Sequence, residues 1–191
     1  MKSVSFQDNS ILRIGFEKDD KLIISNYKSI EVKIKSNSEI QQDKNVVLEI
    51  TLPKHVSSYA LLGVEYICDN SVSSLSVEIR YNDDMRFDIT NNYNVIVGLL
   101  KEYAEAVEAG VKSYFSENDV PKGKLIFHSA MQCNVRSSFS IFFVLTQFIV
   151  ELCIAKKNDI TDFADLYQKY KITNPNMKEK IRHAFAGRLI S

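Results

Sequence analysis

The sequence predicts an α+β fold in which a mostly antiparallel sheet carries its helices on one face, with a C-terminal helical extension. Three observations lead to this class. Hydrophobic and polar residues alternate through much of the first half, the period of a strand. After Leu99 the hydrophobic spacing changes to three or four residues, the period of a helix. The stretch 139–155 is hydrophobic on nearly every side, which predicts a helix between the sheet and other helices.

The strands are expected mainly before residue 98. Three of them pair a hydrophobic face with a polar one, as in a sheet covered on one side: residues 30–35, 46–52 and 75–81. Shorter strands are expected at residues 12–16, 21–24 and 86–89.

The second half is expected to hold a helix from Leu99 to Tyr114, a buried strand at 124–129 that extends the sheet, a helix at 139–155 and two short tail helices. Ser137 or Ser138 can cap the long helix. Thr161 and the Asn174-Pro175 pair are start signals for the tail helices.

A single α+β domain over residues 1–191 is expected, because this length is ordinary for one domain and no linker or repeat divides it. Its parts are a strand-rich segment 1–97, a helix–strand–helix segment 98–155 and a helical tail 156–191. Lys+Arg 24 and Asp+Glu 24 leave no net charge, which excludes a strongly basic nucleic-acid wrapper.

The cysteines and the hydrophobic segments predict a cytoplasmic location. Cys68, Cys133 and Cys153 are odd in number and form no CxxC pair, which favours a reducing compartment. Residues 1–8 lack the hydrophobic segment of a signal peptide. The stretch 139–155 is shorter than the roughly 20 residues that cross a bilayer, so no membrane partner is expected.

No cofactor, metal or enzyme activity is predicted. The six glycines form no phosphate-binding loop, and His55, His128 and His183 are too scattered to suggest a zinc site. The catalytic alternative is Cys133 with His128 as its base, because a following helix N-terminus can lower a thiol pKa. No acidic or amide residue is evidently placed to orient the imidazole, and structural roles for both residues are favoured.

The C-terminal helix offers a first group of candidate binding residues: Lys178, Lys180 and Arg182. Their positive charges suit phosphate, in a segment, 154–191, that has eight Lys/Arg against four Asp/Glu. A solvated helix face accounts for the same residues, since cations are favoured in late helical turns.

Several short segments between Leu75 and Leu152 keep a common order. They are Ser76-Val77-Glu78-Ile79, Phe87-Asp88-Ile89, Val95-Ile96-Val97-Gly98, Leu100-Lys101-Glu102-Tyr103, Ala106-Val107-Glu108-Ala109-Gly110-Val111, Asn134-Val135-Arg136-Ser137-Ser138 and Phe142. Together they resemble the fourth domain of the elongation factor G family over 78 of 191 residues, most specifically at Gly98–Val111.

The resemblance implies a ribosomal-protein domain-2-like fold with two helices on one face and a left-handed crossover, against the usual preference. It also implies a loop before the last helix that reaches the ribosomal decoding site, which corresponds here to Ser129–Arg136. The second group of candidate binding residues therefore comprises Gln132, Cys133, Asn134 and Arg136.

The chain departs from the family at the tip of this loop. A histidine of the family falls at Cys133, and an acidic position falls at Arg136. The Gly- and Arg-rich loop before the family's second strand is replaced by residues 69–74, which include no cation. Residues 1–70 have no counterpart, and a shared scaffold does not by itself transfer function.

Three functions are open from the sequence. The first is a non-enzymatic macromolecule-binding module associated with the ribosome and translation, with a ribosome or RNA partner. The second is a protein–protein interaction module of the immunity or inhibitor kind, which the small size and zero net charge allow. The third is a Cys-dependent enzyme that uses Cys133 and His128.

Overall fold

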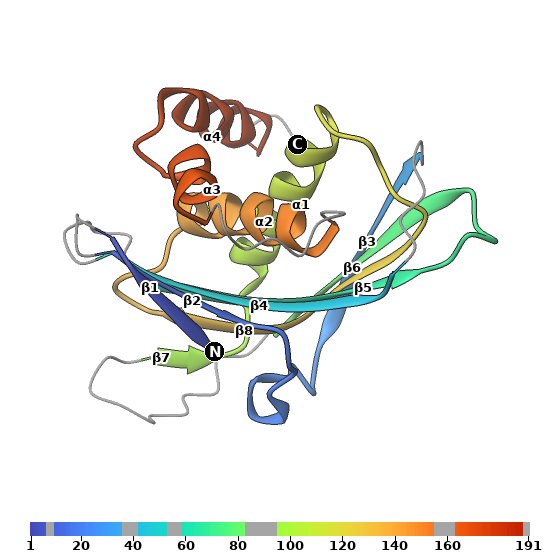
Figure 1. Cartoon of the computed structure of the whole chain (residues 1–191), viewed down its shortest axis with the longest axis horizontal. Coiled ribbons are helices and arrows are strands. Elements are labelled where there is room, and N and C mark those ends of the chain that lie inside the picture. Colours follow the sequence, from blue (N-terminus) through green and yellow to red (C-terminus); the bar gives the residue numbers. More distant parts are fainter. Residues whose placement is uncertain (7–9, 36–41, 53–58, 83–94, 155–162, 189–191) are drawn as a thin grey trace.

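Helices cover one face of a curved sheet (Figure 1) in the computed structural model, which describes residues 1–6, 10–35, 42–52, 59–82, 95–154 and 163–188. The strands are β1 (Lys2–Ser5), β2 (Ile11–Gly15), β3 (Lys28–Lys35), β4 (Lys44–Thr51), β5 (Tyr59–Cys68), β6 (Ser74–Tyr81), β7 (Val95–Val97) and β8 (Gly123–Cys133). The helices are α1 (Lys101–Phe115), α2 (Phe139–Ile154), α3 (Phe163–Tyr170) and α4 (Pro175–Arg188), with a 3₁₀ turn, η1 (Asp20–Leu22).

The sheet has the strand order β1-β2-β4-β5-β8-β6-β3, and β7 pairs with the end of β8. All these pairings are antiparallel except that of β6 with β8, which is parallel. The predicted α+β class, with a mostly antiparallel sheet and helices on one face, is therefore confirmed (Figure 1).

Helix α2 forms the centre of the core between the sheet and the other helices. Its side chains at Phe142, Phe143 and Phe148 are at most 1% exposed, as the continuous hydrophobic stretch predicted. Ser138 caps the helix, because its Oγ accepts the N–H of Ile141 at 3.4 Å. In α1, Gly110 permits a close approach to α2, since a Cβ there would lie 2.8 Å from the Cβ of Thr146.

One expectation about the sheet is wrong. Residues 21–24 do not form a strand: Asp19 Oδ1 accepts the N–H of Lys21 and starts η1 instead. The buried strand expected at 124–129 is present within β8, which lies inside the sheet between β5 and β6. The strand expected at 86–89 falls outside the described residues.

Strand β5, which the sequence analysis did not predict, lies at the middle of the sheet. Side chains on both of its faces are buried, so the alternation that identifies a half-exposed strand is missing. Between Gly63 and Val64 its register with β8 shifts by one residue, which places His128 in a β-bulge. The segment between β2 and β3 runs on the side opposite the helices (Figure 1) and binds the bulge, where Ile24 N–H donates to the His128 carbonyl at 2.9 Å.

Candidate functional site

The structure divides the four candidate residues at the end of β8 into two buried and two exposed ones. Gln132 and Cys133 are both 2% exposed, and the Gln132 Oε1 accepts the N–H of Leu100, the residue before α1, at 3.1 Å. Asn134 and Arg136 are exposed in the turn that joins β8 to α2. Only the latter pair can contact a partner directly, while Gln132 fixes the start of α1 against β8.

Hydrogen bonds within the turn and to the ends of β5 and β8 hold it in place. Within it, the Arg136 N–H donates to the Cys133 carbonyl at 3.2 Å. The Ser137 hydroxyl accepts the Cys133 N–H at 2.8 Å and donates to the carbonyl of Tyr59 at 2.7 Å. In return, the Tyr59 N–H donates to the Arg136 carbonyl at 3.0 Å. The turn is thus anchored to β5 and β8, and it presents Val135, which is 73% exposed, to solvent.

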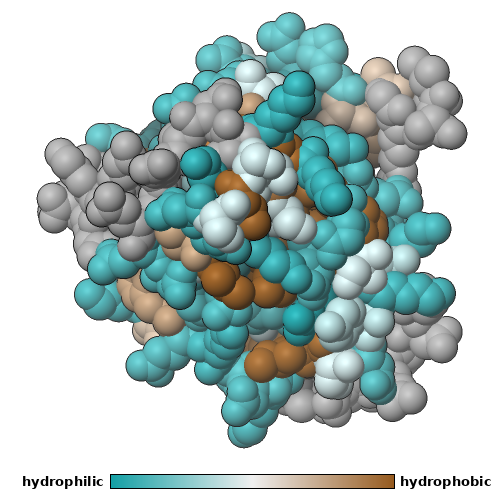
Figure 2. Space-filling view, turned by 90° about the vertical axis from the view of Figure 1, so that its right-hand side faces the viewer, coloured by the Kyte–Doolittle hydropathy of each residue, from teal (hydrophilic) through white to brown (hydrophobic). Residues whose placement is uncertain are grey.

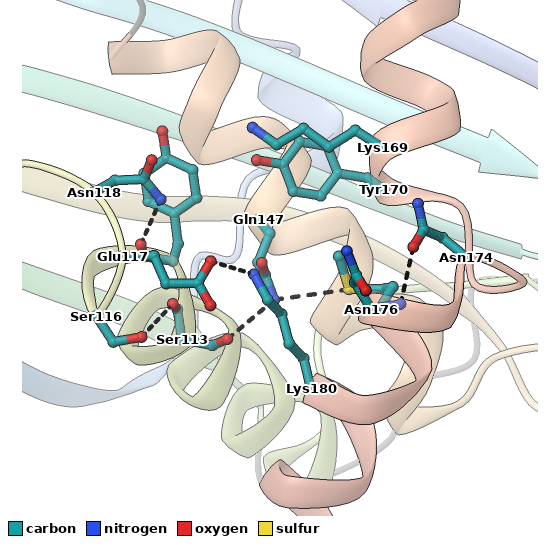
Figure 3. A network of polar contacts seen from close by, with 12 residues as sticks. Ser113, Ser116, Glu117, Asn118, Gln147, Lys169, Tyr170, Asn174, Asn176 and Lys180 are labelled. Carbon is teal, nitrogen blue, oxygen red and sulfur yellow. Dashed lines mark hydrogen bonds and ion pairs between the residues drawn. The ribbon is translucent and has the colours of Figure 1, made fainter.

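The three candidate cations on α4 differ in their surroundings. Lys178 and Arg182 are exposed. Lys180 forms an ion pair with Glu117, just beyond the end of α1, in which Nζ lies 2.6 Å from Oε2 (Figure 3). Lys180 therefore holds α4 against α1, and the two exposed cations remain for a partner.

A polar network behind Lys180 fixes α4 on the helical layer. Gln147 of α2 is 1% exposed, and its Nε2 donates to the Ser113 Oγ at 3.4 Å and to the Met177 Sδ at 3.9 Å (Figure 3). The three residues belong to α2, α1 and α4 respectively. Gln147 thus couples the positions of these helices.

An aromatic contact brings α4 close to the turn after β8. The ring of Phe185, late in α4, lies 4.4 Å from the ring of Phe139, the first residue of α2, between ring centroids. The late part of α4 therefore lies beside the first turn of α2, whereas Lys178 is next to Met177, which contacts Gln147 in the middle of α2. Arg182 is one helical turn before Phe185 in α4.

Cys133 and His128 do not form the pair that a thiol enzyme would need. Both ring nitrogens of His128 bond to other side chains: Nδ1 lies 2.6 Å from Ser129 Oγ, and Nε2 lies 2.8 Å from Asn45 Oδ1. The structure thus gives His128 a role in the β-bulge, as the structural interpretation predicted.

The donors and acceptors in this cluster define a neutral histidine. Asn45 Nδ2 donates to the Phe16 carbonyl at 3.3 Å, which turns Asn45 Oδ1 toward His128. His128 Nε2 must then carry the hydrogen, and Nδ1 accepts from the Ser129 hydroxyl. Burial, together with the positive charge of Lys18, lowers the pKa of His128 to about 4, which agrees with a neutral ring.

The cluster of Ser129, His128 and Asn45 has the composition of a catalytic triad. Its serine and histidine, however, are too buried for a substrate to reach them. Ser129 is 1% exposed and His128 is 3% exposed. Gly63 of β5 lies directly over them, because a Cβ there would be 2.9 Å from both His128 Cε1 and Ser129 Cβ. The cluster therefore satisfies the polar groups of the bulge. The sequence could not reveal it, since Asn45 is 83 residues from His128.

In the described part of the chain, no three His, Cys, Asp or Glu side chains gather as a metal ion would require. None of the helices described is long and hydrophobic enough to span a bilayer.

Comparison with known proteins adds no relative. No family model, no curated protein and no solved structure matches the chain.

Proposed function

We propose that this chain is a non-enzymatic binding module that associates with the ribosome. The observation that carries the proposal is the Phe139–Phe185 contact, which joins the anchored turn after β8 and the cationic face of α4 at one end of the molecule. Arg136, Lys178 and Arg182 are exposed on these two segments, and exposed cations of this kind can contact nucleic-acid phosphates.

The likeness to the fourth domain of elongation factor G supports the same proposal. Strands β6 and β8 are adjacent and parallel, and α1 lies between them in the chain, so the chain makes a crossover in the segment that carries the resemblance. By the resemblance, Ser129–Arg136 corresponds to the loop that meets the ribosome in that family; Ser129–Cys133 belong to strand β8, so only the turn Asn134–Arg136 is left to act as such a loop. We therefore propose a ribosomal-protein domain-2-like fold and a translation-associated role.

Co-sedimentation with ribosomes over a series of salt concentrations tests the proposal. We expect binding at low salt that weakens as salt rises, because phosphate contacts release counterions. Arg136→Glu and the double variant Lys178→Glu/Arg182→Glu are expected to weaken binding and to reduce its salt dependence. Lys2→Glu and Lys21→Glu reverse charges at exposed positions outside this surface and serve as controls. Absence of co-sedimentation at low salt would refute the proposal.

A protein partner, of the immunity or inhibitor kind, is the second candidate. It is favoured by Val135, a hydrophobic side chain that is 73% exposed at the tip of an anchored turn. A pulldown that recovers one stoichiometric protein without RNA, and that fails with Val135→Asp, would select this function over ribosome binding.

A further inference from the structure

Strand β3 (Lys28–Lys35) forms one edge of the sheet. All eight of its residues pair with β6, and no other described strand pairs with it. The backbone groups on its outer side therefore offer a template for a strand from another molecule. β3 lies toward the right of Figure 1, and from that side Figure 2 shows only small hydrophobic patches among hydrophilic side chains.

The two faces of β3 differ in chemistry. Val32 is buried in the core below the helices, and Ile30 and Ile34 are partly buried against it. On the opposite face, Glu31 and Lys33 are exposed. A strand added at this edge would meet hydrophobic side chains on the helical side and charged ones on the other.

The charges on this edge are not neutralised within the described part of the molecule. Glu31 lies opposite Glu78 of β6, and like charges in such positions repel. Glu78 has two cations, Arg80 Nε at 2.6 Å and Lys124 Nζ at 2.7 Å, whereas the Glu31 carboxylate accepts only from the Ser76 hydroxyl at 3.0 Å.

Lys33, two residues further along the same face of β3, likewise has no ion-pair partner among the residues described. The exposed face of this edge therefore presents Glu31 followed by two lysines, Lys33 and Lys35, and Lys35 likewise has no ion-pair partner among the residues described. A second copy of the same strand, running in the opposite direction, carries the complementary order of charges.

We propose that β3 is a homodimer interface in which two copies of the strand pair antiparallel about a two-fold axis at Val32. In this register Glu31 of each copy lies opposite Lys33 of the other, and Ile30 lies opposite Ile34. Two opposite-charge pairs and a continuous hydrophobic row then form together. An axis perpendicular to the sheet keeps the helices of both copies on one side.

Neighbouring registers are less favourable. A shift by two residues in one direction places Glu31 opposite Glu31, which brings like charges together. A shift by two in the other direction pairs Glu31 with Lys35 but places Lys33 opposite Lys33 at the centre, so a repulsive pair accompanies the attractive ones. A shift by one residue breaks the match between the hydrophobic faces of the two copies. The sequence of β3 thus favours the register centred on Val32, in which both charge pairs are attractive, and this inference is independent of the proposed ribosome binding.

Sedimentation velocity of the full chain, with amide chemical shifts recorded over the same dilution series, tests the interface. A single strand pair buries little surface, so we expect weak dimers that form at protein concentrations up to about 1 mM. Shifts that change with concentration should centre on β3. A monomer at the highest concentration, or shifts confined to β1 at the other edge, would overturn the proposal.

Charge-reversal variants test the register. Glu31→Lys and Lys33→Glu are each expected to weaken self-association by about tenfold or more, because each replaces two attractive pairs by two repulsive ones. An equimolar mixture of the two variants should form a heterodimer, and the double variant Glu31→Lys/Lys33→Glu should dimerise like the original chain. Lys2→Glu, on β1, is the matched control. Single variants that dimerise normally, or a mixture that stays monomeric, would refute the register.

Discussion

His128 predicts a specific loss of stability in acid. The neutral ring is buried in the bulge of β8, where it donates to Asn45 and accepts from Ser129. Protonation would place a hydrogen on Nδ1, opposite the hydroxyl hydrogen that now points to it. The positive charge would also be buried near Lys18 and Arg80, which disfavour it, and Glu65 would oppose them.

The magnitude follows from the difference in pKa between the two states. Burial lowers the pKa of His128 from 6.5 to about 4 in the folded protein, so the unfolded chain binds the proton more tightly. Stability from the neutral ring is present above pH 6.5 and is lost as the pH falls toward 4. This linkage removes about 2 kcal/mol from the free energy of unfolding between pH 7.5 and pH 5, and about 3 kcal/mol by pH 4.

Urea unfolding of the original chain and of His128→Gln, at several pH values from 7.5 to 4, measures this effect. The variant is less stable at neutral pH but has no imidazole at this site. The difference in unfolding free energy between the two proteins should therefore shrink by about 2 kcal/mol from pH 7.5 to pH 5. Other titrating groups contribute equally to both proteins and cancel.

Two results would refute this reasoning. One is a stability difference that stays constant between pH 7.5 and pH 5. The other is an imidazole resonance of His128 that titrates near pH 6.5 in the folded protein, as an exposed histidine does.

Three further predictions concern the core, a backbone position and a thiol. Phe142→Asp should leave no folded protein, since a carboxylate would occupy a site that is 0% exposed and stacked on Tyr103; a cooperative thermal transition by circular dichroism would contradict this. Gly123→Ala should cost about 2 kcal/mol or more in urea unfolding, because φ is +130° and a Cβ would lie 2.1 Å from the Ile67 carbonyl oxygen. Gly15→Ala, where the nearest atom belongs to the flexible Met1 side chain, is its control and should change stability little. Native Cys133, 2% exposed, should react with iodoacetamide at neutral pH more slowly than a free thiol, and a faster reaction would favour the Cys-dependent enzyme.

The candidate site was only partly predictable from the sequence. The turn Asn134–Arg136 and the cations Lys178 and Arg182 are exposed, as a binding role requires. Gln132 and Cys133 are buried instead, and Lys180 is paired with Glu117. Burial depends on which segments cover a side chain, and a motif in one segment does not include that information.

Local chemistry in the sequence determined most of the secondary structure. Three kinds of pattern identify elements: the alternation in β3, β4 and β6, the helical spacing of α1 and the hydrophobic stretch of α2. Each pattern reflects hydrophobic side chains that folding removes from water. The serine before α2 likewise sets where that helix begins.

Only the tertiary structure decided which segments meet. It placed β8 between β5 and β6, joined Asn45 to His128, and brought α4 beside the first turn of α2. It also left β3 at an edge with Glu31 and Lys33 exposed. Each of these pairings competes with many others of similar hydrophobicity, and the choice among them comes from packing the whole chain at once.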